Sequence, residues 1–301
     1  MLVGVSFSQR QVQHLGMSEK EVWKKVLEMK VDLIRLACYW NEIETQPGVY
    51  NFKKVTKLLD DVEGNYNTKI VMCVGMKAPR WPEFYIPDWL QTEHYEGELF
   101  VSCYRNFLKK CKQMLSCYKC ISYWQVENEP LDPSGPKNEQ VPLTLLVEAI
   151  KVVKKDEFRP VLVSFWGNKL GKRKLWRKLP SEVDEVGLDL YFKQFVVKIG
   201  GRSVYVGPHD SLERISAIIK EIGRPVWITE LQAEPWEKDI GSYLSKKPKS
   251  MSPEEMFHNW ELVKSLPVKA VLFWGCEYWW WQASKGNHEY IGKFGDILES
   301  R

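Results

Sequence analysis

Short apolar runs rich in β-branched residues alternate along the chain with longer amphipathic stretches of helical period. This alternation is typical of parallel strands joined by crossover helices. Eight such strands close a barrel, so we expect an α/β fold, a single (β/α)8 TIM barrel. The predicted strands are Leu2–Phe7, Leu33–Ala37, Lys69–Val74, Ile121–Val126, Pro160–Phe165, Glu185–Leu190, Pro225–Thr229 and Ala270–Trp274.

Capping residues mark several helix ends. Ser18 and Ser252 each stand three residues before a glutamate, and Pro253 follows the second serine, so both serines indicate helix starts. Gly223 indicates a helix end before the seventh strand. No boundary rich in Pro, Gly or Ser divides the chain, so we predict one catalytic domain over residues 1–301. Few residues follow the eighth strand, and we expect the last helix to be abbreviated or absent.

The composition restricts the class of protein. Apolar residues make up 44% and charged residues 27% of the chain, the range of ordinary globular proteins. No apolar stretch approaches about 20 residues, so we expect no membrane association. The net charge of +4 is spread along the chain, which argues against a nucleic-acid partner. Five scattered histidines supply no metal-ligand cluster, so we expect no metal and no other cofactor.

The N-terminus and the cysteines bear on localisation. Residues 1–7 read as an immediate strand and show no secretion signal. The seven cysteines are scattered, mostly inside apolar segments, as is typical of reduced thiols that pack as small hydrophobes. We therefore expect a cytoplasmic protein, although a secreted protein whose signal had been removed would read the same.

Barrels of this kind build their active sites at the carboxyl ends of the strands, so we expect the candidate site residues there. These positions carry carboxylates, an arginine, amides and aromatic rings, and the chain holds 14 tryptophans, whose rings suit flat, weakly polar sugar faces. This combination indicates acid–base chemistry on a neutral, ring-shaped substrate, a carbohydrate. The candidate site residues are Arg35, Trp40, Trp81, Asn128, Glu129, Trp166, Tyr191, Glu230, Trp274 and Glu277.

Two of these residues meet the requirement of glycosidic cleavage, which needs two carboxyl groups facing each other across the scissile bond. Glu129 and Glu230 close the fourth and seventh strands, which lie across a barrel mouth from each other. A separation of roughly 5 Å indicates a retaining enzyme, and one beyond about 6.5 Å an inverting enzyme. Glu127 shares parity with Glu129 in an extended segment, so a direct role and a structural hydrogen bond or salt bridge both remain open for it.

Several segments resemble clan A glycoside hydrolases, the cellulase-like superfamily. SYWQVENEP at Ser122–Pro130 and WITE at Trp227–Glu230 are similar to the fourth- and seventh-strand motifs of that clan, and RLACYWNEIE at Arg35–Glu44 to its second-strand signature. With Phe-Trp-Gly at the eighth strand, the resemblance covers nearly the whole chain. It is family 5-like, with some similarity to family 42 β-galactosidases, but the histidines that many clan members carry near the third and sixth strand ends are missing.

The resemblance implies a retaining hydrolase of β-linked oligo- or polysaccharides that acts by double displacement through a covalent glycosyl-enzyme intermediate. It implies that Glu129 is the general acid/base, kept protonated by apolar surroundings, and that Glu230 is the nucleophile. Arg35 and Tyr191 would hold Glu230 ionised and aimed. Asn128 would bind the 2-hydroxyl of the sugar being cleaved.

The tryptophans and the wider function leave alternatives open. The resemblance implies that Trp274 floors the subsite of the distorted sugar, whereas Trp40, Trp81 and Trp166 could each stack on a sugar or anchor a loop. An exo-acting β-glycosidase of β-galactosidase type and a transglycosylase fit the same residues. A catalytically silent carbohydrate-binding barrel is the alternative outside the enzymes.

Overall fold

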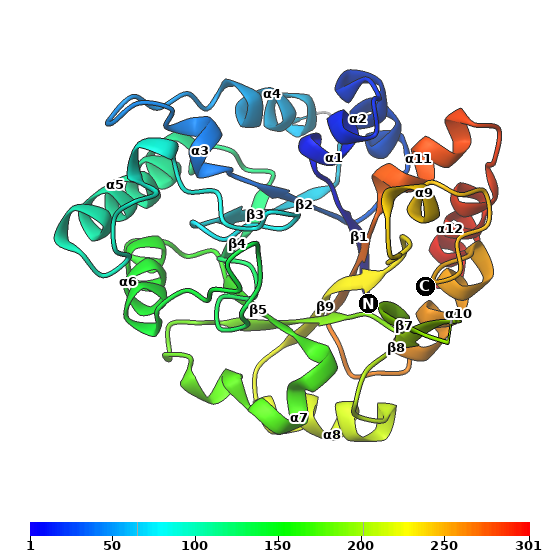
Figure 1. The fold of residues 1–301 in the computed structure, drawn as a ribbon. Helices are drawn as coiled ribbons and strands as arrows, with labels where there is room; N and C mark the ends of the chain where they lie inside the picture. The colour runs from blue at the N-terminus through cyan, green and yellow to red at the C-terminus, as the bar shows by residue number, and fades with distance from the viewer. Residues whose placement is uncertain (65, 201) are drawn as a thin grey trace. The chain divides into compact units, whose positions relative to one another are not determined.

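The computed structural model describes residues 1–64, 66–200 and 202–301. Eight parallel strands pair as a closed barrel in the order β1-β10-β9-β6-β5-β4-β3-β2, which is the predicted fold, and β7 and β8 form a separate two-stranded sheet (Figure 1). The barrel strands are β1 Leu2–Ser6, β2 Leu33–Ala37, β3 Lys69–Val74, β4 Ile121–Val126, β5 Val161–Trp166, β6 Glu185–Leu190, β9 Val226–Gln232 and β10 Ala270–Trp274, and the hairpin strands are β7 Gln194–Ile199 and β8 Arg202–Val206.

The strands agree closely with the sequence pattern. Strands β2, β3, β4, β6 and β10 begin and end at the predicted residues, β1 ends one residue earlier than predicted, and β5 begins and ends one residue later. Strand β9 continues past the predicted end at Thr229, because Leu231 and Gln232 still pair with β10. The hairpin of β7 and β8 was not predicted. Its strands pair only with each other and lie largely exposed, so they lack the buried apolar run by which the barrel strands were recognised.

The helices follow the strands. They are α1 Gln9–His14, α2 Glu19–Glu28, α3 Trp40–Ile43, α4 Lys53–Val62, α5 Glu98–Leu115, α6 Leu143–Lys154, α7 Leu170–Arg173, α8 Leu212–Ile222, α9 Ile240–Tyr243, α10 Pro253–Val263, α11 Cys276–Ser284 and α12 Glu289–Glu299, with short 3-10 turns η1 Asp88–Leu90, η2 Gly167–Lys169 and η3 Leu175–Lys178.

The expectation that the last helix would be abbreviated or absent was wrong. Helix α12 has 11 residues, as many as α8 and α10. Its buried residues Tyr290, Phe294 and Ile297 recur at helical spacing, and the helix packs against α10 and α11. This apolar face stabilises a full helix in the short segment that remains after β10.

The predicted helix starts and the predicted helix end are confirmed. The hydroxyl of Ser18 accepts a hydrogen bond from the Glu21 N–H, and that of Ser252 accepts one from the Glu255 N–H. Gly223 follows α8 with φ of 67°, the left-handed conformation that glycine adopts without a steric penalty.

Contacts divide the chain into two compact units. The first comprises Met1–Val31, Trp166–Lys174 and Leu188–Arg301, and the second comprises Asp32–Phe165 and Leu175–Gly187. In the first unit β1 pairs with β10 and β10 with β9, and α10 packs against β9. In the second unit β2, β3 and β4 pair in succession, and α5 and α6 pack together with α6 against β4.

Two further observations concern the thiols and the helices. None of the seven cysteines forms a disulfide, and Cys38, Cys73, Cys111 and Cys276 are buried. Of the helices in the described part of the chain, none combines the length and the apolar character that crossing a membrane requires.

Candidate active site

In the second unit, the chain leaves β4 in an unusual backbone conformation. Glu127 has φ of 61° and Glu129 has φ of 43°, a region that residues with a side chain rarely adopt. Such residues cost of order 1–3 kcal/mol each and persist where the surrounding structure holds them. The segment from Glu127 to Glu129 is therefore held by contacts, and those contacts show what each side chain does.

Glu127 is buried and has a structural role. Its carboxylate accepts hydrogen bonds from the N–H groups of Met76 at 3.1 Å and Lys77 at 2.6 Å, and from the hydroxyl of Tyr104. Burial raises the pKa of Glu127 to about 7, while the hydrogen bonds from Tyr104 and the two N–H groups act in the opposite direction. A Cβ atom on Gly75 would lie 2.3 Å from the Glu127 carboxyl carbon, so the carboxylate needs a glycine at this position. Of the two roles open to Glu127, the contacts favour the structural one.

Asn128 lies in a buried polar cluster. Its Oδ1 accepts hydrogen bonds from Arg35 at 3.4 Å, from Gln125 at 3.1 Å and from the hydroxyl of Ser164 at 3.4 Å. Arg35 also donates to Oε1 of Gln125 at 3.3 Å. With Oδ1 engaged by three donors, the orientation of the amide is set, and its Nδ2 is the group that can donate to a ligand.

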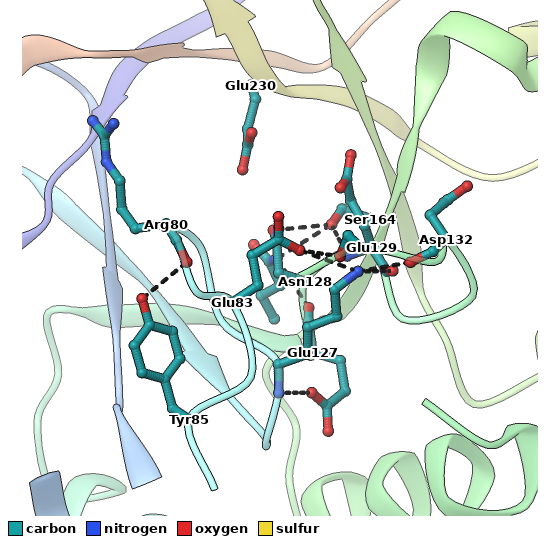
Figure 2. A network of polar contacts seen from close by, with 12 residues as sticks. Arg80, Glu83, Tyr85, Glu127, Asn128, Glu129, Asp132, Ser164 and Glu230 are labelled. Carbon is teal, nitrogen blue, oxygen red and sulfur yellow. Dashed lines mark hydrogen bonds and ion pairs between the residues drawn. The ribbon is translucent and has the colours of Figure 1, made fainter. Parts of the chain in front are cut away.

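Glu129 is held through its main chain. Its N–H donates to the hydroxyl of Ser164 at 3.0 Å, and its carbonyl oxygen accepts from Nζ of Lys77 at 2.7 Å. Figure 2 shows Glu83, Glu129, Asp132 and Ser164 around this network. The side chain of Glu129 is partly exposed, in contrast to that of Glu127.

In the first unit, Glu230 lies at an irregularity of β9. Ile228 pairs with Val271 and Leu231 with Phe273, so two residues of β9, one of them Glu230, stand opposite a single residue of β10. A bulge of this kind redirects the side chains at the position where it occurs. Glu230 is almost fully buried, so the direction of its carboxylate is set by its immediate contacts.

Tyr191, the residue after β6, donates its hydroxyl to Oε2 of Glu230. The predicted contact between these two residues is therefore present. Asn168 anchors the tyrosine, since its Oδ1 accepts from the Tyr191 N–H at 3.0 Å and its Nδ2 donates to the Tyr191 carbonyl at 2.7 Å. The ring of Trp236 packs edge-on against Tyr191 with 5.2 Å between centroids, and 43% of Trp236 is exposed.

Two of the predicted binding residues are interior residues. Trp40 is 0% exposed, stacks on Phe107 and donates its indole N–H to Glu44 at 2.7 Å, so it offers no ring face to a sugar. Glu277 is fully buried, and its carboxylate accepts the backbone N–H of Ser8 at 2.5 Å. Helices α3 and α11 direct both side chains into the core, and this burial does not favour the binding roles predicted for Trp40 and Glu277.

The other predicted tryptophans reach the surface to different extents. Trp81 is 67% exposed in the loop after β3. Trp166 ends β5 and is partly exposed, with the ammonium of Lys169 lying 5.0 Å from its ring. Trp274 ends β10 and is nearly buried.

Asn128 and Glu129 are held in place by Gln125 and Ser164, which the sequence prediction missed, and by Lys77, a strand-end residue to which it gave no role. A signal was available for two of them, since Gln125 and Ser164 are polar residues inside otherwise apolar strand runs. Such residues need partners when buried, so they indicate an internal polar network. Among the described residues, no three His, Cys, Asp or Glu side chains gather as metal ligands would.

No family model matches the chain, and no curated protein matches it in sequence. Several solved structures share its fold. A GH5_18 protein from Bifidobacterium longum subsp. longum has a TM-score of 0.66 at 13% identity, covering 100% of this chain and 79% of its own, and a variant of it was solved in complex with Manβ1-4GlcNAc. A cold-adapted β-galactosidase from Rahnella sp. R3 has a TM-score of 0.66 at 11% identity, covering 100% and 56%. A psychrophilic glycoside hydrolase family 10 endo-β-1,4-xylanase has a TM-score of 0.63 at 12% identity, covering 91% and 86%.

Proposed function

We propose that this chain is a retaining β-glycoside hydrolase that cleaves β-linked oligo- or polysaccharides, with Glu129 as general acid/base and Glu230 as nucleophile. The observation that carries the proposal is the pair of glutamates at the carboxyl ends of β4 and β9, the fourth and seventh barrel strands, each within its own polar network. Barrels of this fold build their active sites at that end of the strands. The likeness in fold to solved glycoside hydrolases supports the same class of reaction.

The environment of Glu230 suits a nucleophile. A carboxylate attacks the anomeric carbon best when it is held in one rotamer, and the hydroxyl of Tyr191 donates a hydrogen bond that restrains Glu230 in this way. In the first step the Glu230 oxygen bonds to the anomeric carbon as the glycosidic bond breaks. In the second step water displaces Glu230, so two inversions retain the configuration.

The environment of Glu129 suits a general acid/base. Its main chain is fixed by Ser164 and Lys77, and its partly exposed side chain can give a proton to the leaving oxygen and later take one from water. The neighbouring Asn128, with its Oδ1 engaged by protein donors, would offer Nδ2 to the sugar 2-hydroxyl. Hydrogen bonds to that hydroxyl strengthen in the transition state.

Aromatic side chains would bind the sugar rings. Trp81, Trp166, Trp274 and Trp236 each stand just after a barrel strand or at its end, and flat aromatic faces suit the apolar face of a pyranose. The Manβ1-4GlcNAc bound to the solved Bifidobacterium variant supports a carbohydrate ligand for this fold. A screen of aryl glucosides, mannosides, galactosides and xylosides, with soluble glucans and mannans, would identify the sugar.

Azide rescue of Glu230→Gly on an activated aryl glycoside tests the nucleophile. The glycine leaves room for azide, which would attack the anomeric carbon directly and give a glycosyl azide of inverted configuration. Glu234→Gly is the matched control, because Glu234 lies near the same end of β9 and contacts Tyr243 at 2.9 Å. If azide restores no turnover to Glu230→Gly, or restores it equally to both variants, the assignment fails.

Azide also tests Glu129 with a different stereochemical outcome. In Glu129→Ala the nucleophile is intact, so azide would react with the glycosyl-enzyme and give an azide of retained configuration. NMR of the two products distinguishes the roles. A product of the same configuration from both variants would contradict the proposed division of labour.

A further inference from the structure

Lys77, three residues after β3, has a completely buried side chain that carries an ammonium group. Its Nζ donates to the carbonyl oxygens of Glu129 at 2.7 Å and Asp132 at 2.9 Å, and lies 3.4 Å from the Glu83 carboxylate. Burying an ammonium is costly unless it is paired and hydrogen-bonded, and these three oxygens supply that compensation. Two of these three oxygens belong to the segment after β4, so the compensation for burying the ammonium comes mainly from that segment.

The main chain of Lys77 contacts the same segment. Its N–H donates to the Glu127 carboxylate at 2.6 Å, and its carbonyl accepts the Asn128 N–H at 2.8 Å. The N–H, the carbonyl and the ammonium of this one residue thus contact three successive residues, Glu127, Asn128 and Glu129. Lys77 therefore restrains the backbone of the turn in which Glu127 and Glu129 take their left-handed conformation.

Glu83 links the ammonium of Lys77 to Ser134 in the loop after β4. Its carboxylate accepts a hydrogen bond from the hydroxyl of Ser134, and its own N–H donates to the Arg80 carbonyl at 2.8 Å. The Glu129 carbonyl also accepts from the Asp132 N–H at 3.1 Å, so the turn is closed by one backbone bond and one lysine bond. Removing the ammonium would leave the Glu129 carbonyl with the weaker turn bond and would take the Lys77 cation away from Glu83.

We propose that Lys77 is a positioning residue for proton transfer by Glu129. This inference rests on the proposed function. Lys77 sets the backbone of Glu129, and the backbone sets the direction in which the acid/base side chain leaves the turn. Misplacement of a catalytic group by about 1 Å can cost on the order of 100-fold in rate.

A leaving-group series with Lys77→Met tests the proposal. The substitution keeps the length of the side chain and both backbone hydrogen bonds, and removes only the ammonium. A displaced acid matters for leaving groups that need protonation, so kcat/KM should fall about 100-fold for an unsubstituted phenyl glycoside and less than about 3-fold for the dinitrophenyl glycoside. A loss that is equal across the series would overturn the proposal, because it would reflect a general structural defect.

Lys112→Met is the matched control. Lys112 likewise donates to two backbone carbonyls, those of Val152 at 3.4 Å and Lys155, but it joins α5 to the end of α6 and does not contact the turn after β4. It should leave the leaving-group dependence unchanged. If Lys112→Met steepens this dependence as much as Lys77→Met does, the effect is not specific to Lys77 and the proposal fails.

Two further variants keep the result decisive. If Lys77→Met does not fold, Glu83→Gln removes the charge partner of Lys77 and should steepen the same dependence by a smaller factor; an unchanged slope then counts against the proposal. Glu129→Ala distinguishes a failure of the proposed function from a failure of the role proposed for Lys77. If that variant shows no steep dependence, the proposed function fails; if it does and the Lys77 and Glu83 variants do not, only the role of Lys77 fails.

Discussion

Glu129 and Glu230 occupy equivalent ends of barrel strands but are held in opposite ways. Glu129 is fixed through its main chain by Ser164 and Lys77, and its side chain is partly exposed. Glu230 is almost fully buried within β9, and its carboxylate itself accepts the hydroxyl of Tyr191. Two backbone atoms of Glu129 are restrained, and in Glu230 the carboxylate itself is restrained.

This difference matches what the two proposed roles require. A nucleophile keeps one ionisation state and one direction, so a direct hydrogen bond to its carboxylate is favourable. A general acid/base must release and regain a proton in each cycle, and contacts to its backbone restrain its position without fixing its protonation state. The comparison teaches that two chemically identical side chains can be given different functions by where the restraint is applied.

The largest expected effect is the loss of kcat/KM on replacing either glutamate, and the two losses should differ in how they depend on the leaving group. Glu230→Gln should lower kcat/KM by on the order of 10⁴-fold or more for every aryl glycoside, because no glycosyl-enzyme can form. Glu129→Gln should lower it by about 10²- to 10⁴-fold for poor leaving groups only. Steady-state kinetics across a phenol series would measure both. A loss for Glu129→Gln that is independent of the leaving group would contradict the comparison.

The second effect concerns Glu127 and is a pH dependence of stability. Burial raises the pKa of Glu127 from 4.5 to about 7, so the folded protein binds this proton more tightly than the unfolded chain does. The contribution of this group to stability is fully present below pH 4.5 and is lost as the pH rises to about 7, by about 3 kcal/mol.

Urea unfolding at pH 5, 6 and 7 checks this expectation by comparison with Glu127→Gln. The variant cannot titrate at this position, so its unfolding free energy should decline less than that of the wild-type protein over the same range. Parallel pH profiles for the two proteins would show that Glu127 is not protonated in the folded state.

The third effect tests the direct restraint on Glu230. Tyr191→Phe removes the hydroxyl that donates to Glu230 and should lower kcat/KM by about 10- to 100-fold, since a hydrogen bond to a charged group contributes about 1.5–3 kcal/mol. Tyr243→Phe is the matched control, because it removes a tyrosine hydroxyl that donates to Glu234 at 2.9 Å. Equal losses in the two variants would mean that the Tyr191 contact has no special role.

The smallest effect concerns Trp236, whose half-exposed ring packs on Tyr191. Trp236→Ala should raise KM for an oligosaccharide by about 10-fold or less, as expected for the loss of one aromatic contact of about 0.5–1.5 kcal/mol. Phe158→Ala, which removes a ring that is 91% exposed ahead of β5, should leave KM unchanged. An unaltered KM in the Trp236 variant would remove this ring from the proposed sugar site.

The sequence by itself determined the barrel, most of its strand boundaries and the candidate glutamates. The spacing of apolar residues and the capping residues, such as Ser18 and Gly223, are features of the local sequence. The position of a residue after a strand then follows from counting along the chain. For this reason the order of residues alone places Glu129, Glu230 and Tyr191 at or near strand ends.

Only the tertiary structure decided which way the selected side chains point and what holds them. Trp40 and Glu277 share strand-end positions with exposed Trp81, yet both are buried. Lys77 lies 52 positions from Glu129 in sequence and donates to its backbone. Burial and hydrogen-bond partners depend on residues far away along the chain, which no local pattern specifies.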